Sequence, residues 1–326
     1  MTGGVVVVGA GLAGATAATS LRELGFDGTV TLLGAEPVLP YERPGLSKGY
    51  LAGSTSADDL QVHGAEVYET LGIDVRLGTE AVALDAQAQR LSLADGSTLS
   101  YDDVVIATGG VNRRPPLPGM ELTGVHQLRT IAEASALRSA ASMARTAVVV
   151  GQGFVGCEVA ATLRSLGLDV TMVDPLPGPL WALGDEISAR VAQWHADAGV
   201  RMRNAVGAAS LDGDGTVTSV TLADGAVLPA DLVVVGVGAR PATDWVSGVD
   251  LVDGAVAVDA DGRSSAPRAW AIGDAAAAWD EQTRDHRRVE HFDSAIVQGQ
   301  RVAHALAGAP SPAVGRTWFW TDQHGD

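Results

Sequence analysis

Two runs of four apolar residues, each followed directly by glycine, are the clearest feature of the hydrophobic pattern. The runs are Val5–Val8 and Ala147–Val150. Short apolar runs bounded by glycine are typical of strands that are buried on both faces of a parallel sheet. Each run leads into a segment of small, helix-compatible residues, so the pattern predicts helices over 15–25 and 157–167. We therefore expect two strand–turn–helix units of the same design.

The remaining pattern predicts that both units continue in the same order. The strands expected in the first unit are one ending at Leu33, a meander at 74–77, 81–85 and 90–93, and a buried strand at 103–108. Those expected in the second unit are at 169–173, 200–203, 216–222 and 232–237, with a helix at 185–198. The matching order favours an internal repeat of one domain plan. A Pro-rich loop at 37–45, a linker at 112–119 and a last helix at 293–306 complete the prediction.

Both turns have the spacing G-x-G-x-x-G, formed by Gly9, Gly11 and Gly14 in the first unit and by Gly151, Gly153 and Gly156 in the second. In a dinucleotide-binding turn one glycine makes the tight turn, one lets the backbone approach a pyrophosphate, and one lets the helix pack on the strand. The N–H groups at the start of the helix then favour a phosphate. One such spacing is weak evidence, but two in this context predict an α/β fold with two Rossmann-like dinucleotide-binding domains. Two dinucleotides that exchange electrons indicate a flavin and a nicotinamide.

An acidic residue follows the second strand of each unit. Glu36 and Asp174 hold these positions, where a carboxylate can accept hydrogen bonds from ribose hydroxyls. The carboxylate of Asp174 would also repel a 2′-phosphate, and residues 175–180 contain no arginine that could bind one. The sequence therefore predicts that the second site prefers NADH to NADPH.

Composition limits the possible settings of the protein. A length of 326 residues suits two or three domains, and a net charge of −17 argues against non-specific binding to nucleic acid or anionic membranes. The apolar runs are too short to cross a membrane, and the chain enters a strand at once, so we expect no membrane anchor and no signal peptide. The single cysteine, Cys157, excludes a dithiol relay, indicates a reducing cytoplasm, and is expected to be a small buried core residue. No Cys or His cluster supports a metal site.

The densest group of basic residues is Arg284, His286, Arg287 and Arg288. It is either a local patch at which an acidic electron carrier docks or a solvated charged loop. The sequence leaves both interpretations open.

Four motifs resemble the FAD-dependent ferredoxin reductases of oxygenase systems, a family that includes rubredoxin reductases and the reductase components of aromatic dioxygenases. The motifs are Arg43-Pro44-Gly45-Leu46-Ser47-Lys48, Leu128-Arg129-Thr130, Ile272-Gly273-Asp274 and Trp318-Phe319-Trp320-Thr321-Asp322-Gln323. The resemblance spans the chain and implies an FAD-binding domain at 1–112 and 243–326, interrupted by an NAD-binding domain at 113–242. It also implies a C-terminal interface domain, which we expect to be missing because the chain ends where its first strand would start.

The resemblance implies roles for individual residues. Lys48 would lie near N5 of the flavin and pair with Glu158, so that the two tune hydride acceptance. Glu36 would replace an aspartate that similar proteins place at Ala35. FAD contacts are implied for Gly9, Gly11, Ala13, Gly14, Ala35, Glu36, Arg43, Lys48, Ala81, Thr108, Gly109, Arg129, Gly273, Asp274, His291, Phe292 and Trp320. Contacts with NADH are implied for Gly151, Gly153, Phe154, Val155, Gly156, Asp174 and Gly238.

The residues alone leave simpler roles open for several of these positions. Lys48 could be solvated, Glu158 could suit the start of a helix, and Asp274 could be a helix cap. Hydride transfer to a flavin needs no general acid, so we expect His291 to be structural. Trp320 could be an ordinary core residue.

The resemblance implies an NADH:ferredoxin oxidoreductase that takes a hydride onto FAD and passes single electrons to a 2Fe–2S ferredoxin, serving an oxygenase or P450 system. The alternatives are an NADH oxidase or rubredoxin reductase, which differ only in the acceptor, and a redox-sensing flavoprotein of the apoptosis-inducing-factor type. A further alternative is a fragment that binds FAD but lacks the surface for its acceptor. No nucleic acid or membrane partner is expected.

Overall fold

The computed structural model describes residues 3–313 and 318–325, which form two compact units. The first unit comprises the described residues of Met1–Glu42, Gln61–Val111 and Arg240–Phe319. The second comprises those of Arg43–Leu60, Asn112–Ala239 and Trp320–Asp326. The predicted division into domains at 1–112, 113–242 and 243–326 includes an assignment of one nucleotide to each domain, and that division and assignment stay predictions.

The first unit is built on a five-stranded parallel sheet in the order β21-β7-β1-β2-β3. Its strands are Ala269–Ala271, Asp103–Ile106, Val5–Val8, Val30–Leu33 and Asp74–Arg76. The central strand β1 is a run of four valines buried on both faces, as expected for a parallel sheet that is covered on both sides. Because all strands are parallel, the turns that follow β1, β2, β7 and β21 lie at one edge of the sheet.

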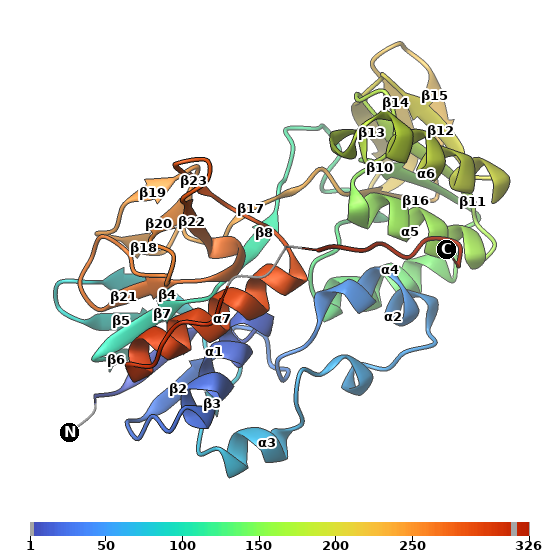
Figure 1. Cartoon of the computed structure of the whole chain (residues 1–326). Helices are drawn as coiled ribbons and strands as arrows, with labels where there is room; N and C mark the ends of the chain where they lie inside the picture. The colour runs from blue at the N-terminus through green and yellow to red at the C-terminus, as the bar shows by residue number, and fades with distance from the viewer. Residues whose placement is uncertain (1–2, 314–317, 326) are drawn as a thin grey trace. The chain divides into compact units, whose positions relative to one another are not determined.

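Helices cover one face of this sheet. The helices α1 (Leu12–Glu23) and α7 (Phe292–Ala307) lie side by side there, as Figure 1 shows. Val5 and Val7 pack on this side against small and branched residues of both helices. The contact is close because a Cβ added to Gly299 of α7 would lie 2.8 Å from the carbonyl oxygen of Ala13.

The opposite face is covered by strands in both parallel and antiparallel pairs, so the first unit has a helix layer, a parallel sheet and a second β layer of mixed strand direction. Val6 and Val8 of β1 pack there against Leu84 and Val256. The strands of this layer are β4 (Ala81–Asp85), β5 (Arg90–Leu93), β6 (Thr98–Ser100), β18 (Val246–Ser247), β19 (Leu251–Val252), β20 (Ala255–Val258), β22 (Ala276–Asp280) and β23 (Asp285–Arg287). The short helix α3 (Ala65–Thr70) precedes β3, and β8 (Gly110–Asn112) pairs with β17 (Ala239–Pro241).

The second unit repeats this plan around a parallel sheet in the order β12-β11-β10-β16-β9. Its strands are Arg201–Asn204, Asp169–Asp174, Thr146–Val150, Leu232–Val235 and Val125–His126. Its helices are α2 (Gly49–Ala52), α4 (Ile131–Ala141), α5 (Phe154–Ser165) and α6 (Asp185–Asp197). A three-stranded antiparallel sheet of β13 (Ala208–Asp214), β14 (Thr216–Leu222) and β15 (Val227–Pro229) packs on β10, β11 and β16.

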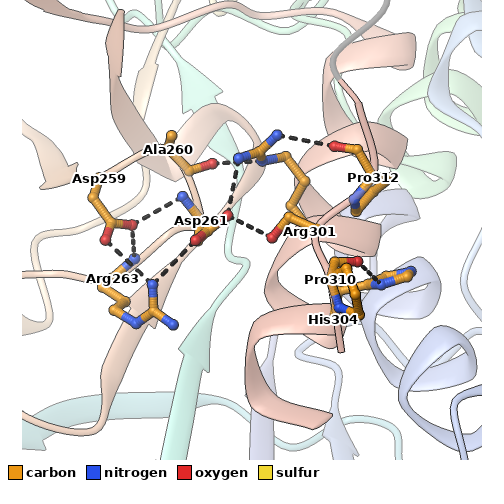
Figure 2. Close-up of polar contacts among 9 residues, drawn as sticks. Asp259, Ala260, Asp261, Arg263, Arg301, His304, Pro310 and Pro312 are labelled. Carbon is orange, nitrogen blue, oxygen red and sulfur yellow. Dashed lines mark hydrogen bonds and ion pairs between the residues drawn. The ribbon is translucent and has the colours of Figure 1, made fainter. Parts of the chain in front are cut away.

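An arginine on α7 fixes the chain that follows this helix within the first unit. Arg301 donates to the carbonyl oxygens of Ala260 and Pro312 at 2.7 and 3.1 Å and pairs with Asp261 at 2.9 Å. Figure 2 shows these bonds, together with the contact of His304 with the carbonyl oxygen of Pro310. The segment after α7 is therefore held against the turn before β21 rather than leaving the unit directly.

A buried histidine holds the C-terminal segment in the second unit. The side chain of His195, on α6, is fully buried, and its Nδ1 lies 3.0 Å from Nε2 of His324. The two rings meet edge to face at 4.9 Å. Burial and the neighbouring His324 lower the pKa of His195 to about 4, against a smaller opposing effect of Gln323.

The lowered pKa of His195 predicts a loss of stability on mild acidification. Its ordinary value is 6.5, so between pH 6.5 and 4 the unfolded chain binds a proton that the folded chain excludes. We expect the free energy of unfolding to fall by about 2 kcal/mol between pH 7 and pH 5 through this residue. Urea titrations followed by tryptophan fluorescence at both pH values measure it. The same titrations of His195→Leu should show a smaller pH dependence, and an unchanged dependence would contradict the assignment.

The structure corrects several expectations about the elements. The helices after the glycine turns begin three residues earlier than predicted, because Gly11 and Gly153 themselves are the N-cap residues. The strand predicted at 74–77 belongs to the parallel sheet beside β2 and not to a meander. Within the expected loop at 37–45, Arg43–Ser47 begins a 3₁₀ turn, since proline is tolerated at the start of a helical turn. The helix α4 was not predicted.

Candidate active site

The three glycines of the first turn differ in whether the surrounding protein requires a glycine at that position. A Cβ added to Gly9, which has a φ of +118°, would lie 2.2 Å from the carbonyl oxygen of Ala107, and one added to Gly14 would lie 2.0 Å from that of Gly9. Gly11 differs, because its φ of −96° suits any residue and an added Cβ would meet no protein atom within 4 Å. Contacts within the protein therefore explain why glycine is needed at Gly9 and Gly14, but they give no reason for a glycine at Gly11. Open space at this backbone position fits a pyrophosphate that approaches the start of α1.

The second turn repeats this division. Gly151 has a φ of +109°, and a Cβ added to it would lie 2.2 Å from the carbonyl oxygen of Gly236. A Cβ added to Gly156 would lie 2.1 Å from the carbonyl oxygen of Gly151. At Gly153, with a φ of −74°, an added Cβ would again meet nothing within 4 Å. The second unit thus has the same open position at the start of α5. Phe154 and Val155, the first residues of that helix, remain 37% and 43% exposed and so are accessible to a ligand.

The residues predicted to bind FAD in the first unit follow the carboxyl ends of its strands. Gly9 follows β1, Ala35 and Glu36 follow β2, Thr108 and Gly109 follow β7, and Gly273 and Asp274 follow β21. A Cβ added to Gly273 would lie 3.2 Å from Cβ of Ala13, so Asp274 is brought beside the glycine turn. The parallel sheet therefore collects these residues at one edge, where open α/β sheets bind ligands. Their individual contacts with FAD stay predictions.

Two of these residues have hydrogen-bond partners in the protein. The carboxylate of Glu36 accepts a hydrogen bond from the Tyr41 hydroxyl at 2.8 Å, which orients it at the carboxyl end of β2. The Thr108 hydroxyl donates to the carbonyl oxygen of Ala242 at 2.7 Å. Ala35 is exposed, and Ala81 is the first residue of β4.

His291 lies at the start of the last helix of the first unit, and its expected structural role stays a prediction. It is the N-cap of α7, and its Nδ1 accepts a long hydrogen bond, 3.4 Å, from the backbone N–H of Asp293. Burial lowers the pKa of His291, with a smaller opposing effect of Asp293 and Asp274, so the imidazole is neutral when it accepts this bond. Phe292 is the first residue of the helix.

Asp174, at the end of β11, is oriented by backbone N–H groups. Its Oδ2 accepts from Gln152 at 2.7 Å, and its Oδ1 accepts from Leu176 at 2.8 Å. Each carboxylate oxygen still has a free lone pair, because a carboxylate offers about four acceptor sites. The side chain is buried, with only 8% exposed, and lies directly at the second glycine turn, since Gln152 is part of that turn. Gly238, the other predicted contact, follows β16.

Gln152 is a residue that the sequence reasoning missed. Its side chain is 2% exposed, and its Nε2 donates to Oδ1 of Asn204, at the end of β12, at 2.9 Å. Its carbonyl oxygen accepts from the N–H of Leu180. The variable position of a G-x-G turn carries no signal of its own, so only the fold reveals that this side chain ties the turn to the neighbouring strands.

Lys48 and Glu158 form a buried ion pair in the second unit. Their Nζ and Oε2 atoms lie 2.8 Å apart, and the side chains are 21% and 7% exposed. Lys48 also donates to the carbonyl oxygen of Pro44 at 3.2 Å. Lys48 is therefore not the solvated residue that the simpler interpretation allowed, although the action of the pair on a cofactor stays a prediction.

Two hydroxyls that were not predicted complete the surroundings of Glu158. The Ser47 hydroxyl donates to Oε2 at 2.6 Å, and the Thr321 hydroxyl donates to Oε1 at 2.9 Å. A buried charge is tolerated when it is paired and hydrogen-bonded in this way. Ser47 belongs to the Arg43–Lys48 motif and Thr321 to the Trp318–Gln323 motif, so both motifs meet at Glu158 in the structure.

The remaining predicted flavin contacts lie in the second unit. The guanidinium of Arg43 donates to the carbonyl oxygen of Arg129, which joins these two residues. Thr130 and Glu133 form a capping box that starts α4, so part of the Leu128–Thr130 motif is a helix start. Trp320 is half-buried. None of these contacts tests a flavin role for Arg43, Arg129 or Trp320.

Residues 3–313 and 318–325 contain no group of three or more Cys, His, Asp or Glu side chains placed to hold a metal ion. None of their helices combines the length and the apolar character needed to cross a membrane. The Cys157 thiol is fully buried, and burial together with the charges of Glu158 and Asp174 raises its pKa, which makes it an inert core residue.

Two of the basic residues at 284–288 lie close to acidic side chains. Arg287 lies 3.8 Å from Asp280, and Arg288 is paired with Glu290. His286 meets the ring of Trp279 edge-on. The charges of this group are therefore partly compensated within the first unit, and its use as a docking patch stays a prediction.

Two open glycine turns on two parallel sheets, with a buried ion pair beside the second, define a dinucleotide-binding oxidoreductase. The family of pyridine nucleotide-disulphide oxidoreductases matches residues 3–299, and the chain belongs to this family. Rhodocoxin reductase of Rhodococcus erythropolis is 38% identical over 98% of this chain and 76% of its own length. The biphenyl dioxygenase system ferredoxin–NAD(+) reductase component of Paraburkholderia xenovorans is 36% identical over 98% of this chain and 78% of its own length.

Solved structures agree with this membership. The covalent putidaredoxin reductase–putidaredoxin complex matches with a TM-score of 0.94 and 32% identity, covering 99% of this chain and 79% of that chain. A ferredoxin reductase from Rhodopseudomonas palustris matches with a TM-score of 0.94 and 36% identity, covering 98% and 80%. The predicted resemblance to ferredoxin reductases, the α/β fold with two Rossmann-like units, and FAD and a pyridine nucleotide as cofactors are confirmed. The family is named after a disulphide, but this chain has a single cysteine and therefore no redox-active cysteine pair of its own.

Proposed function

We propose that this chain is an NADH-dependent ferredoxin reductase of an oxygenase system, acting in the cytoplasm on a 2Fe–2S ferredoxin. The proposal is carried by one observation about Gly11 and Gly153. At both positions the backbone is accessible, and neither packing nor the backbone conformation explains why the residue is a glycine. Two such positions fit two pyrophosphates. When bound, FAD supplies the ability to accept a hydride and to release electrons one at a time.

The residues of each unit would hold one cofactor. In the first unit, the turn at Gly9–Gly14 and the start of α1 would bind the FAD pyrophosphate, with Glu36 at the adenosine ribose and Asp274 at the ribityl chain. In the second unit, the turn at Gly151–Gly156 would bind the NADH pyrophosphate. The carboxylate of Asp174 would accept its ribose hydroxyls.

The ion pair supplies the charges that act on the reaction. The Lys48 ammonium would stabilise the negative charge that a hydride brings to the cofactor, and Glu158 keeps this buried cation compensated before the reaction. No residue needs to donate or accept a proton for hydride transfer itself. Lys48 and Glu158 are therefore proposed to act by electrostatics and orientation.

The nature of the acceptor is supported by the relatives. Their names describe reductases of ferredoxins and of rhodocoxin, and one solved structure holds a reductase together with putidaredoxin. In this chain the single cysteine leaves no dithiol through which electrons could pass, so they would leave from the flavin directly.

An absorption spectrum of the purified protein, recorded before and after anaerobic addition of NADH, tests the proposal. We expect the two bands of oxidised flavin in the visible region and their loss when NADH is added. Subsequent addition of an oxidised 2Fe–2S ferredoxin should restore them. A protein that stays colourless with excess FAD would refute the proposal. A reduced flavin–NAD complex that persists with ferredoxin present would favour the redox-sensing alternative.

Substitution of Asp174 tests the coenzyme preference. In Asp174→Ala we expect the ratio of kcat/KM for NADH to that for NADPH to fall by about tenfold, because the 2′-phosphate is no longer repelled. Steady-state reduction of an artificial acceptor with each coenzyme measures this ratio. Asp231→Ala is the matched control, since Asp231 also accepts two backbone N–H groups, those of Arg145 and Thr146. A ratio that is the same in Asp174→Ala and the wild type would remove Asp174 from the site.

A further inference from the structure

The carboxylate of Glu158 is held by groups from two segments distant in sequence. Oε2 takes the Lys48 ammonium at 2.8 Å and the Ser47 hydroxyl at 2.6 Å, both from the segment before α2. Oε1 takes the Thr321 hydroxyl at 2.9 Å, from the C-terminal segment. The two oxygens thus have separate donors, and Thr321 is the partner of the oxygen that does not face Lys48.

The donor segment has its own anchors in the second unit. Gln323 is 1% exposed, and its Nε2 donates to the Thr321 hydroxyl oxygen at 2.9 Å. One residue further, His324 meets the buried ring of His195 at 3.0 Å. A hydroxyl that accepts from Gln323 directs its single proton to Glu158, so the orientation of the Thr321 bond is fixed by its neighbours.

We infer that Thr321 is a positioning residue for the Lys48–Glu158 pair: its bond to Oε1 holds the plane of the carboxylate so that Oε2 stays directed at the ammonium. The Gln323 amide and the contact between His195 and His324 hold Thr321 in place. The inference rests on the proposed function, because it concerns the ion pair that is proposed to act there.

The separate donors of the two carboxylate oxygens distinguish a positioning role of Thr321 from ordinary packing. Ser47 already satisfies Oε2 together with Lys48, so rotation of the carboxylate is limited on that side. Without Thr321, Oε1 has no donor of those named, so only the contacts of Oε2 resist rotation of the carboxylate about its last bond. Glu158 is 7% exposed, so solvent would replace the missing donor poorly.

The test compares Thr321→Val, which keeps the shape but removes the hydroxyl, with Thr321→Ser, which keeps the hydroxyl. We expect the limiting rate of flavin reduction by NADH, followed by stopped flow, to fall roughly tenfold in Thr321→Val. It should recover to within about twofold of the wild type in Thr321→Ser. Thr221→Val is the matched control, because the Thr221 hydroxyl also donates to a carboxylate of the second unit, Asp212, at 2.6 Å. The control should reduce at the wild-type rate.

A double-mutant cycle distinguishes positioning from general destabilisation. The midpoint potential of bound FAD, measured by dye-coupled titration, should shift in Thr321→Val in the wild-type background and stay unmoved when the same substitution is made in Glu158→Gln. If Thr321→Val acted by general destabilisation, it would shift the midpoint potential by the same amount in both backgrounds. An unshifted potential, or equal shifts in both, overturns the inference.

The outcomes also separate this inference from the proposed function. If NADH reduces the wild type and Thr321→Val alike, the inference fails while the function stands. If NADH does not reduce the wild type, the function fails, and the midpoint potentials still decide whether Thr321 acts through Glu158.

Discussion

Replacing Glu158 with alanine is expected to slow the reduction of bound flavin by NADH by roughly 100-fold while FAD stays bound. The substitution leaves the Lys48 ammonium, 21% exposed, without its charged partner and the Ser47 and Thr321 hydroxyls without their acceptor. The cation is then free to leave its position, so the charge that is proposed to assist hydride transfer is no longer held. The proposed contacts with the FAD pyrophosphate and riboses lie in the first unit, to which Glu158 does not belong, so we expect FAD retention to change less than the rate.

Stopped-flow absorbance at saturating NADH measures the rate, and the flavin-to-protein absorbance ratio measures retention. Glu158→Gln, which preserves shape and hydrogen bonding but not charge, shows how much of the effect is electrostatic. Asp212→Ala is the control, since Asp212 likewise accepts from two hydroxyls, those of Ser210 and Thr221, but lies in β13. A wild-type rate in Glu158→Ala would exclude the ion pair from the reaction.

The sequence was informative wherever one local rule decides the structure. The four-valine strand at Val5–Val8, the helix α6 and the strand β14 lie where the pattern predicts them, because burial and turn residues fix them independently of distant contacts. The glycine spacing likewise located both turns. Its three positions are equivalent in the sequence, however, and only the coordinates show that Gly11 and Gly153 are the open ones.

Expectations failed where tertiary contacts decide. The strand β3 is only three residues long and half-exposed, so nothing local distinguishes a meander strand from an edge strand paired with β2. The helix α4 is a run rich in alanine and serine with a weakly amphipathic pattern, and of its capping box, Thr130 and Glu133, only Thr130 lies within a family motif.

The polar surroundings of the ion pair could not be predicted from the chain alone. Ser47 lies 111 positions from Glu158, and Thr321 lies 163 positions from it. Hydroxyls are common in loops and give no signal of a buried partner. A motif can indicate that such a residue matters, but the carboxylate that it serves becomes visible only when the segments are placed in the fold.

Alanine at Gly11 is expected to abolish FAD binding while the protein still folds, and alanine at Gly153 is expected to do the same for NADH alone. In both positions the backbone conformation suits alanine and no protein atom lies within 4 Å of the added Cβ. Loss of glycine at a helix N-cap costs about 1 kcal/mol of stability, which a folded domain tolerates. The methyl group would instead occupy the space into which a pyrophosphate must come, and we expect each affinity to fall by roughly 100-fold or more.

The two substitutions control each other, because each should spare the cofactor of the other unit. Flavin content from the visible spectrum and calorimetric titration with NAD⁺ measure the two affinities, and circular dichroism measures folding. Gly14→Ala is the contrasting variant: its Cβ would lie 2.0 Å from the carbonyl oxygen of Gly9, so we expect the first unit to be destabilised and FAD to be lost with the fold. A Gly11→Ala protein that folds and keeps its full complement of FAD would show that the open position at the start of α1 is not where the pyrophosphate binds. The same result for NAD⁺ with Gly153→Ala would show that the open position at the start of α5 is not where the pyrophosphate of the second dinucleotide binds.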